Sequence, residues 1–181
     1  LGTTATRLNA GDAIMAGFAD HYIPEEKWPG LIEALGEIGD CRPLFAAAQE
    51  PPEGPVTRDK DHIDRCFSGN ALADIIKVLR SEDTPFSQSS LKAMRRNSPL
   101  SMACEIEIVH RLRGTTDIRK ALELEYRFTY RAMEHGDFLE GIRAAIIDKD
   151  RIPHWQHQID EVPMVAMSRM LLPLGAAKLT F

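Results

Sequence analysis

Closely spaced helix starts and stops are the feature that narrows the possible folds of this chain most. Asn9 precedes an apolar helical face and Gly17 follows it, as an N-cap residue and a C-terminal glycine do. The longest helical pattern begins near Asp117 and stops at Gly136. Residues 18–23 alone read as a short extended segment. This punctuation predicts an all-α, or nearly all-α, chain of about eight helices.

Apolar periodicity supports the same fold class. Two stretches repeat apolar residues at the i, i+3, i+4 and i+7 positions of one helical face. They are Trp28, Leu31, Ile32 and Leu35, and Leu72, Ile75, Ile76 and Leu79. The longest pattern carries apolar residues on several sides instead, which predicts a central helix buried in the core. A helix with one face covered by a partner is the alternative.

One interruption stands out between these patterns, at Pro51-Pro52-Glu53-Gly54-Pro55. Proline has no backbone donor and glycine is conformationally permissive, so a helix does not continue through this run. Residues 36–61 are therefore predicted to form a loop. Because this loop is too short for a clear domain linker, residues 1–181 are predicted to form a single region.

Composition excludes several classes of protein. The chain has 22 basic and 27 acidic residues, a net charge of −5, which gives no global electrostatic attraction to nucleic acid. No apolar run reaches the roughly 20 residues that span a bilayer, so no membrane association is expected. Cys41, Cys66 and Cys104 lack C-x-x-C spacing, which favours a reduced, intracellular setting. The chain opens on Leu1 directly before a helix signal, as expected of a piece cut from a longer protein.

The sequence shows no catalytic machinery. It contains no Gly-Gly, Gly-x-Gly or Gly-x-Ser-x-Gly pattern that would build an anion cradle or a nucleophile elbow. The pairs Glu105/Glu107 and Glu123/Glu125 are two residues apart, so on a helix their carboxylates point to different faces. His154-Trp155-Gln156-His157 has no third ligand nearby. We predict no catalytic residue and no metal ligand in this chain.

A charged turn follows the last strong helix pattern. Asp137 is predicted to cap this helix, with Glu140 in the capping-box position. Asp148-Lys149-Asp150-Arg151 then precedes Pro153. From spacing alone, the favoured interpretation is local charge pairing at the negative end of the helix dipole. The alternative is a phosphate contact by Lys149 and Arg151, joined by Arg143 from two turns earlier.

Several segments of the chain resemble the crotonase (enoyl-CoA hydratase/isomerase) superfamily, in particular its 3-hydroxyisobutyryl-CoA hydrolases. The most specific element is Asp148-Lys149-Asp150 followed by Pro153-x-Trp155. The other resembling segments are Arg7-Leu8-Asn9-Ala10-Gly11-Asp12-Ala13, Ala16-Gly17-Phe18-Ala19-Asp20-His21, Ile63-Asp64-Arg65-Cys66-Phe67-Ser68, Ser98-Pro99-Leu100-Ser101, Leu124-Glu125-Tyr126-Arg127 and Asp137-Phe138-x-Glu140-Gly141-x-Arg143-Ala144. The resemblance implies the helical C-terminal half of an α/β protein, without the N-terminal ββα spiral core.

The resemblance also implies an organisation and a function. Its parts are crossover helices at 1–35, the loop at 36–61, a helical insertion at 62–97, C-terminal helices at 98–155 and a tail at 156–181. The implied parent reaction is hydrolysis of a short β-hydroxyacyl-CoA thioester in valine breakdown. In the family the oxyanion donors and carboxylates precede this region, so the chain alone is expected to be inactive. Its expected role is to shape the acyl-CoA pocket and to carry homo-oligomer contacts.

Site and location follow from the same resemblance. Lys149 takes the place of a lysine that approaches coenzyme A in related crotonases, and Arg143 and Arg151 are the accompanying candidates. Coenzyme A enters as part of the substrate, and no separate cofactor is expected. The expected location is the cytoplasm of a bacterium or the mitochondrial matrix of a eukaryote. Two competing functions stay open: an enoyl-CoA hydratase/isomerase half, and a free-standing, non-catalytic helical interaction module.

Overall fold

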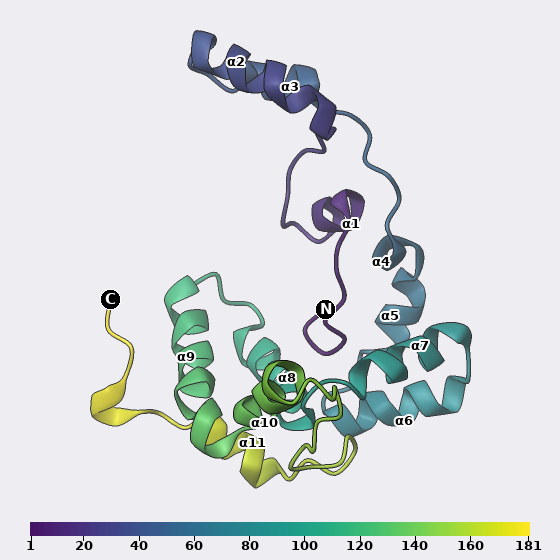
Figure 1. Ribbon diagram of the computed structural model, residues 1–181, viewed down its shortest axis with the longest axis vertical. Coiled ribbons are helices and arrows are strands. Elements are labelled where there is room, and N and C mark those ends of the chain that lie inside the picture. The colour runs from purple at the N-terminus through teal and green to yellow at the C-terminus, as the bar shows by residue number, and fades with distance from the viewer. The chain divides into compact units, whose positions relative to one another are not determined.

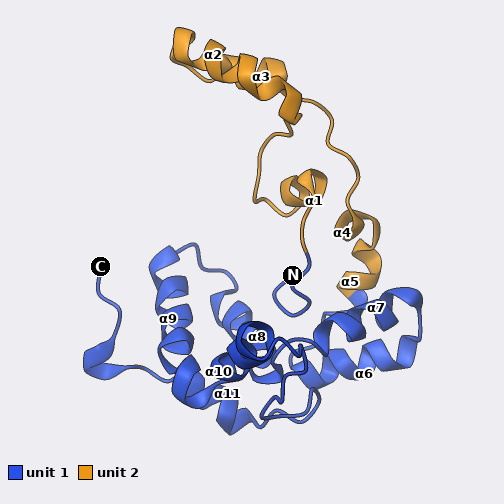
Figure 2. Cartoon of the chain, in the orientation of Figure 1, with its two compact units in different colours: residues 1–6, 65–181 blue, residues 7–64 orange.

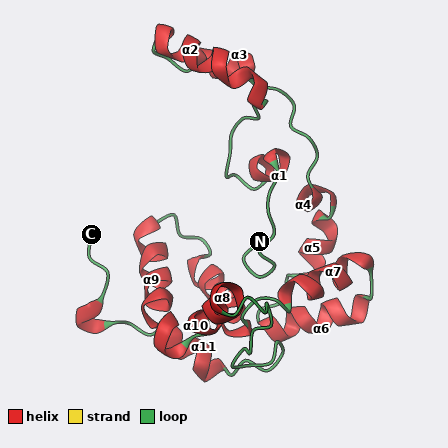
Figure 3. Cartoon of the chain, viewed as in Figure 1, coloured by secondary structure: helices red, strands yellow, loops and turns green.

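The computed structural model describes all 181 residues and contains helices but no β-strand, which confirms the all-α prediction (Figure 3). The elements are α1 (Ala10–Met15), η1 (Glu25–Lys27), α2 (Trp28–Ile38), α3 (Arg42–Ala47), α4 (Pro55–Arg58), α5 (Lys60–Cys66), α6 (Leu72–Glu82), α7 (Pro85–Met94), α8 (Pro99–Leu112), α9 (Ile118–His135), α10 (Phe138–Ile142), η2 (Arg143–Ile147), α11 (Met164–Met170) and η3 (Gly175–Ala177) (Figure 1). None of these helices is both long enough and apolar enough to serve as a membrane span.

The chain departs from the predicted organisation in two places. The predicted loop at 36–61 contains the short helices α3 and α4, because Pro43 and Pro55 stand in their first turns, where a helix needs no N–H. The extended segment predicted at 18–23 makes only an isolated bridge between Tyr22 and Gln49, with 2.9 Å from Gln49 N to Tyr22 O. A single bridge does not continue into a sheet.

Residues 1–181 form two compact units where a single region was predicted (Figure 2). Unit 1 comprises residues 1–6 and 65–181, and unit 2 comprises residues 7–64. The N-terminal residues join unit 1 through a long-range contact: the side-chain amide of Asn97 donates to the carbonyl of Thr3 at 2.9 Å. Residues that are close in sequence therefore belong to different units, a division that local patterns do not reveal.

Unit 1 holds the hydrophobic core. The repeat of α6 buries Leu72, Ile75, Ile76 and Leu79 on one face, against Met94 of α7 and Met102, Ala103 and Ile106 of α8. A second cluster joins the other side of α8 to α9 and α11, and it consists of Leu100, Cys104, Ile108, Leu124, Met170 and Leu171. Helix α8 lies between the two clusters and contributes to both, so it is the central helix of this unit.

Helix α9 is therefore not the buried central helix that its apolar pattern predicts. Its buried residues are Leu124 and Ala132. Tyr130 and Met133 are 54% and 59% exposed. Helix α9 instead contacts α11. The guanidinium of Arg131 donates to the carbonyls of Met170 at 3.1 Å and Leu172 at 2.7 Å. These carbonyls lie at the C-terminal end of α11, where helix carbonyls lack intrahelical partners.

Unit 2 is organised around a buried carboxylate. Asp12 of α1 is fully buried and accepts hydrogen bonds from Val56 N at 3.1 Å, Thr57 N at 2.8 Å and Thr57 Oγ1 at 2.9 Å. It thereby satisfies backbone donors in the first turn of α4. Gly54 is needed beside it, because a Cβ there would lie 2.0 Å from the Asp12 carboxyl carbon.

We expect the α1–α4 link to weaken in acid. Burial alone would raise the pKa of the Asp12 carboxyl, but hydrogen bonds from Thr57 and Val56, with the charge of Arg58, together lower it. A group whose pKa is lower when folded stabilises the fold above its unfolded value and loses that contribution as pH falls through the folded value. Amide exchange protection at Val56 and Thr57, corrected for intrinsic rates, should therefore fall below about pH 4.

Asp12→Asn provides the control for this titration. The amide cannot ionise and offers one acceptor oxygen in place of two, so protection should be lower at neutral pH and independent of pH below it. Protection in the wild-type chain that stays constant down to pH 2 would contradict the assignment.

Candidate functional site

Helix α10 continues into a wider, π-helical turn, and this turn shapes the charged turn that follows it at residues 148–151. After the five residues of α10, the chain continues as the π-helical turn η2, in which Asp148 N donates to Arg143 O at 2.8 Å. Arg151 N then donates to Ala144 O at 3.0 Å. Lys149 and Arg151 both have φ of +57°, the left-handed region that residues with a Cβ seldom adopt. The turn is thus tightly folded back on its own helix.

The predicted capping box at Asp137 and Glu140 is wrong. Asp137 makes no cap hydrogen bond within α10. Its buried carboxylate instead accepts from Ser98 Oγ at 2.5 Å and from Gln156 N at 3.0 Å. Ser98 also caps α8 by accepting from Ser101 N. Asp137 therefore joins the start of α8 to the segment after the charged turn, using donors that are distant in sequence.

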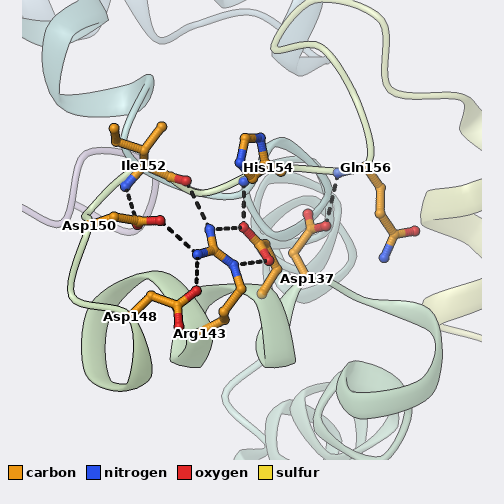
Figure 4. A network of polar contacts seen from close by, with 8 residues as sticks. Asp137, Arg143, Asp148, Asp150, Ile152, His154 and Gln156 are labelled. Carbon is orange, nitrogen blue, oxygen red and sulfur yellow. Dashed lines mark hydrogen bonds and ion pairs between the residues drawn. The ribbon is translucent and has the colours of Figure 1, made fainter.

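Arg143 lies at the centre of the site (Figure 4). Its Nε and Nη2 bind the two carboxylate oxygens of Glu140 at 2.9 and 2.7 Å. Its Nη1 donates to Asp148 at 2.6 Å and to Asp150 at 2.7 Å, and Nη2 also donates to Ile152 O at 3.0 Å. A guanidinium has five N–H donors. All five of them have an acceptor within the turn, so none is left for a ligand.

Two carboxylates of this network, those of Glu140 and Asp150, are held in their charged form. Hydrogen bonds from Arg143, followed by that from His154 N at 2.6 Å, lower the pKa of Glu140 to about 2. Arg143 and the N–H of Ile152 likewise lower the pKa of Asp150, and the carboxylates raise the pKa of Arg143. Glu140, Asp150 and Arg143 are therefore ionised at any physiological pH.

Lys149 and Arg151 have a different environment from Arg143. Both side chains are exposed, and no hydrogen bond or ion pair engages either of them. The structure thus separates the three predicted coenzyme A contacts: one is enclosed by acids and two are free cations on the outside of the turn. The sequence does contain a signal for this difference. Three acids, Glu140, Asp148 and Asp150, lie three residues before Arg143 and five and seven residues after it. The spacing argument did not use them.

Trp155 is a further site residue, which the sequence analysis named only as part of the Pro153-x-Trp155 motif. Its ring lies over Gly141, where an added Cβ would be 3.8 Å from the indole. It borders two cavities in unit 1, of about 400 and 340 Å³, both of which are also lined by Ser98, Ser101 and Phe128. Its buried indole N–H has no acceptor. A partly open, largely apolar recess therefore lies beside α10 and η2.

No catalytic constellation accompanies this turn. No group of three or more histidine, cysteine or acidic side chains is arranged to hold a metal ion. The buried thiols of Cys66 and Cys104 have pKa values raised to about 11 and about 12, chiefly by burial, so they are poor nucleophiles at neutral pH. The turn exposes two unpaired cations, Lys149 and Arg151, and His154 lies beside it with its backbone N–H bound to Glu140.

Comparison with known proteins gives consistent matches along the chain. The family described as enoyl-CoA hydratase/isomerase matches residues 1–171. The mitochondrial 3-hydroxyisobutyryl-CoA hydrolases of Homo sapiens and Rattus norvegicus are 31% and 29% identical, over 100% of this chain and 50% of theirs. A solved structure of an enoyl-CoA hydratase from Rhodobacter sphaeroides 2.4.1 is 49% identical, with a TM-score of 0.90, over 100% of this chain and 52% of that one. The chain thus spans about half the length of the relatives it matches.

Proposed function

The chain belongs to the enoyl-CoA hydratase/isomerase family, and we propose that it acts as the helical half of a short-chain acyl-CoA thioester hydrolase of the 3-hydroxyisobutyryl-CoA type. Family membership confirms the crotonase-type resemblance, and the region it matches is the C-terminal half of such proteins. In this proposal the chain is inactive alone. It buttresses the missing core, completes the acyl-CoA pocket and carries oligomer contacts.

The observation that carries this proposal is the absence of an apolar core from unit 2. Apart from Pro24, no apolar side chain within residues 7–64 is buried. Six large apolar side chains of this unit are exposed instead, and they are Met15, Phe18, Trp28, Ile32, Ile38 and Phe45. A unit of this size needs a buried apolar core or a covering partner to be stable. We therefore assign the exposed apolar side chains of unit 2 to contacts with the other half of the enzyme.

The charged turn supports the choice of an acyl-CoA substrate. Lys149 and Arg151 are exposed and unpaired, and coenzyme A carries phosphate groups that such cations recognise. The local charge pairing that spacing alone favoured is present in the structure, because Asp148 and Asp150 bind Arg143, and it leaves Lys149 and Arg151 unpaired. Lys149 and Arg151 remain the proposed contacts, and Arg143 is no longer one of them.

Two companion assignments belong to the same proposal. We infer that the chain works in a homo-oligomer, because large apolar side chains of unit 1, including Ile146, Ile147 and Met164, are also exposed. We place the enzyme in the bacterial cytoplasm or, in a eukaryote, in the mitochondrial matrix; the animal relatives named above are described as mitochondrial.

A second candidate function is enoyl-CoA hydration or isomerisation. It is favoured by the 49% identity to the Rhodobacter sphaeroides enoyl-CoA hydratase, which exceeds the 29–31% identity to the animal hydrolases. The hydrolase remains the leading proposal because the Asp148-Lys149-Asp150 turn with Pro153 and Trp155 resembles that subgroup.

Binding of a fluorescent dye specific for exposed apolar surface tests the proposed role of unit 2. The 181-residue chain should bind the dye strongly, and Ile32→Lys, at a side chain that is 70% exposed, should reduce that binding. Glu33→Gln on the same helix changes the charge by the same amount without removing apolar surface, so it should leave dye binding unchanged. Dye binding at background level would contradict the proposal and favour the free-standing interaction module.

A further inference from the structure

Charges alternate in sign along residues 148–151. An external anion binds Lys149 and Arg151 together only when both cations face solvent. Asp148, Lys149, Asp150 and Arg151 are consecutive, so each cation is next to at least one carboxylate. An unrestrained turn of this composition would neutralise itself, because a carboxylate on a neighbouring residue competes with any external anion for the same cation. For Lys149 and Arg151 to bind an anion, the carboxylates of Asp148 and Asp150 must therefore be held away from them.

Arg143 is placed to do this. Both aspartates of the turn point inward to its Nη1, at 2.6 Å from Asp148 and 2.7 Å from Asp150 (Figure 4). The same guanidinium also binds the carbonyl of Ile152, and Asp150 accepts from the N–H of Ile152 at 2.8 Å. Both aspartates are therefore engaged by Arg143, while their side chains stay partly exposed.

The backbone completes the separation. Lys149 and Arg151 share a φ of +57°, and Arg151 N is fixed to Ala144 O at 3.0 Å. With these two residues left-handed and the aspartates bound to Arg143, the side chains of Lys149 and Arg151 extend to solvent without a partner. Two free cations separated by a single residue form a suitable pair for the two phosphates of a diphosphate.

We propose that Arg143 is a positioning residue: it sequesters the carboxylates of Asp148 and Asp150 so that Lys149 and Arg151 stay available to a diphosphate. The coenzyme A source of that diphosphate rests on the proposed function, whereas the charge separation itself does not. Arg143 contacts no ligand, because all five of its N–H donors are already engaged.

Titration of the 181-residue chain with inorganic pyrophosphate, followed by calorimetry, tests the proposal. Arg143→Gln should weaken binding on the order of tenfold, because the released carboxylates then pair with Lys149 and Arg151. The triple variant Arg143→Gln/Asp148→Asn/Asp150→Asn should recover affinity close to wild type, since it has no competing carboxylates. Lys149→Ala/Arg151→Ala should abolish binding. Arg95→Gln, an exposed arginine on another part of unit 1, is the charge-matched control and should bind like wild type.

The recovery distinguishes positioning from other roles of Arg143. The comparison is with Asp148→Asn/Asp150→Asn, which keeps Arg143 and removes the same two negative charges. If Arg143 bound phosphate directly, or only kept the turn folded, the triple variant would bind much more weakly than this double variant. Such a result overturns the proposal, as do an Arg143→Gln chain of wild-type affinity and a wild-type chain that does not bind pyrophosphate. If Arg143→Gln fails to fold, Arg143→Lys replaces it and should show intermediate affinity, because one ammonium cannot satisfy three carboxylates; unchanged affinity there would also overturn it.

The same titration separates this inference from the proposed function. The expected pattern with pyrophosphate, in a protein that transforms no acyl-CoA, would leave the charge separation standing and remove the proposed function. Acyl-CoA turnover with pyrophosphate binding that is insensitive to Arg143 would do the reverse.

Discussion

Replacing Lys149 and Arg151 together with alanine should raise the KM for acyl-CoA on the order of 30-fold in the complete enzyme, with kcat nearly unchanged. The two side chains are exposed and unpaired, and the proposed function assigns them to phosphate groups remote from the thioester. Contacts at that distance stabilise the bound substrate and the transition state equally, so their loss appears in KM. Steady-state kinetics with a saturable acyl-CoA substrate measures both constants.

The matched control for this double variant is Lys92→Ala/Arg95→Ala, at Lys92 of α7 and at the C-cap residue that follows this helix, which removes the same charge from exposed positions of unit 1. It should change KM by less than about twofold, because long-range effects of exposed charges are screened at physiological salt. A fall in kcat at unchanged KM in the Lys149/Arg151 variant would contradict the phosphate role and indicate a part in the chemistry.

Leu79→Ala should lower the free energy of unfolding of unit 1 by about 3–5 kcal/mol. Leu79 is fully buried on α6 and belongs to the cluster that joins α6, α7 and α8. Its truncation removes apolar contacts and leaves a cavity, and the packed neighbours Ile76 and Met94 relax only partly to fill it. Urea unfolding followed by circular dichroism measures the loss.

Lys77→Ala on the exposed side of the same helix is the control for Leu79→Ala, and it should change the unfolding free energy by no more than about 0.5 kcal/mol. A loss below 1 kcal/mol for Leu79→Ala would mean that α6 does not form the core of unit 1.

Much of the local structure could be predicted from sequence because its causes are local. The repeat at Leu72, Ile75, Ile76 and Leu79 predicts the buried face of α6 correctly. Asn9 caps α1 as predicted, through a 2.9 Å hydrogen bond from Asp12 N. In both cases all of the groups involved lie within two turns of one helix, where spacing is a reliable guide.

Features that depend on distant residues could not be predicted. Asp137 has the residue type and position of a cap, but Ser98 and Gln156 supply its hydrogen bonds. The separation into two units depends on contacts such as that between Thr3 and Asn97. Helix α9 carries apolar residues on several sides, yet the fold covers only one of them. An apolar pattern indicates which surfaces can be buried, and the tertiary fold decides which are.

In the candidate site, too, sequence spacing does not determine which side chains meet. The sequence places Arg143, Lys149 and Arg151 within nine residues, and charge counting treats them as equivalent cations. The π-helical turn η2 and the two left-handed residues decide which cation meets the acids. Of the three predicted coenzyme A contacts, Arg143 therefore binds the acids of the turn, and Lys149 and Arg151 remain exposed cations.

The central claim is that this chain is part of an enzyme acting on a short β-hydroxyacyl-CoA thioester. The measurement that tests it most directly is thioester hydrolysis by the native polypeptide, captured from its source cell with an antibody against this chain. We predict release of free coenzyme A from 3-hydroxyisobutyryl-CoA, with slower turnover of crotonyl-CoA. Rapid hydration of crotonyl-CoA without hydrolysis would favour the hydratase, and a polypeptide that transforms neither substrate would contradict the account.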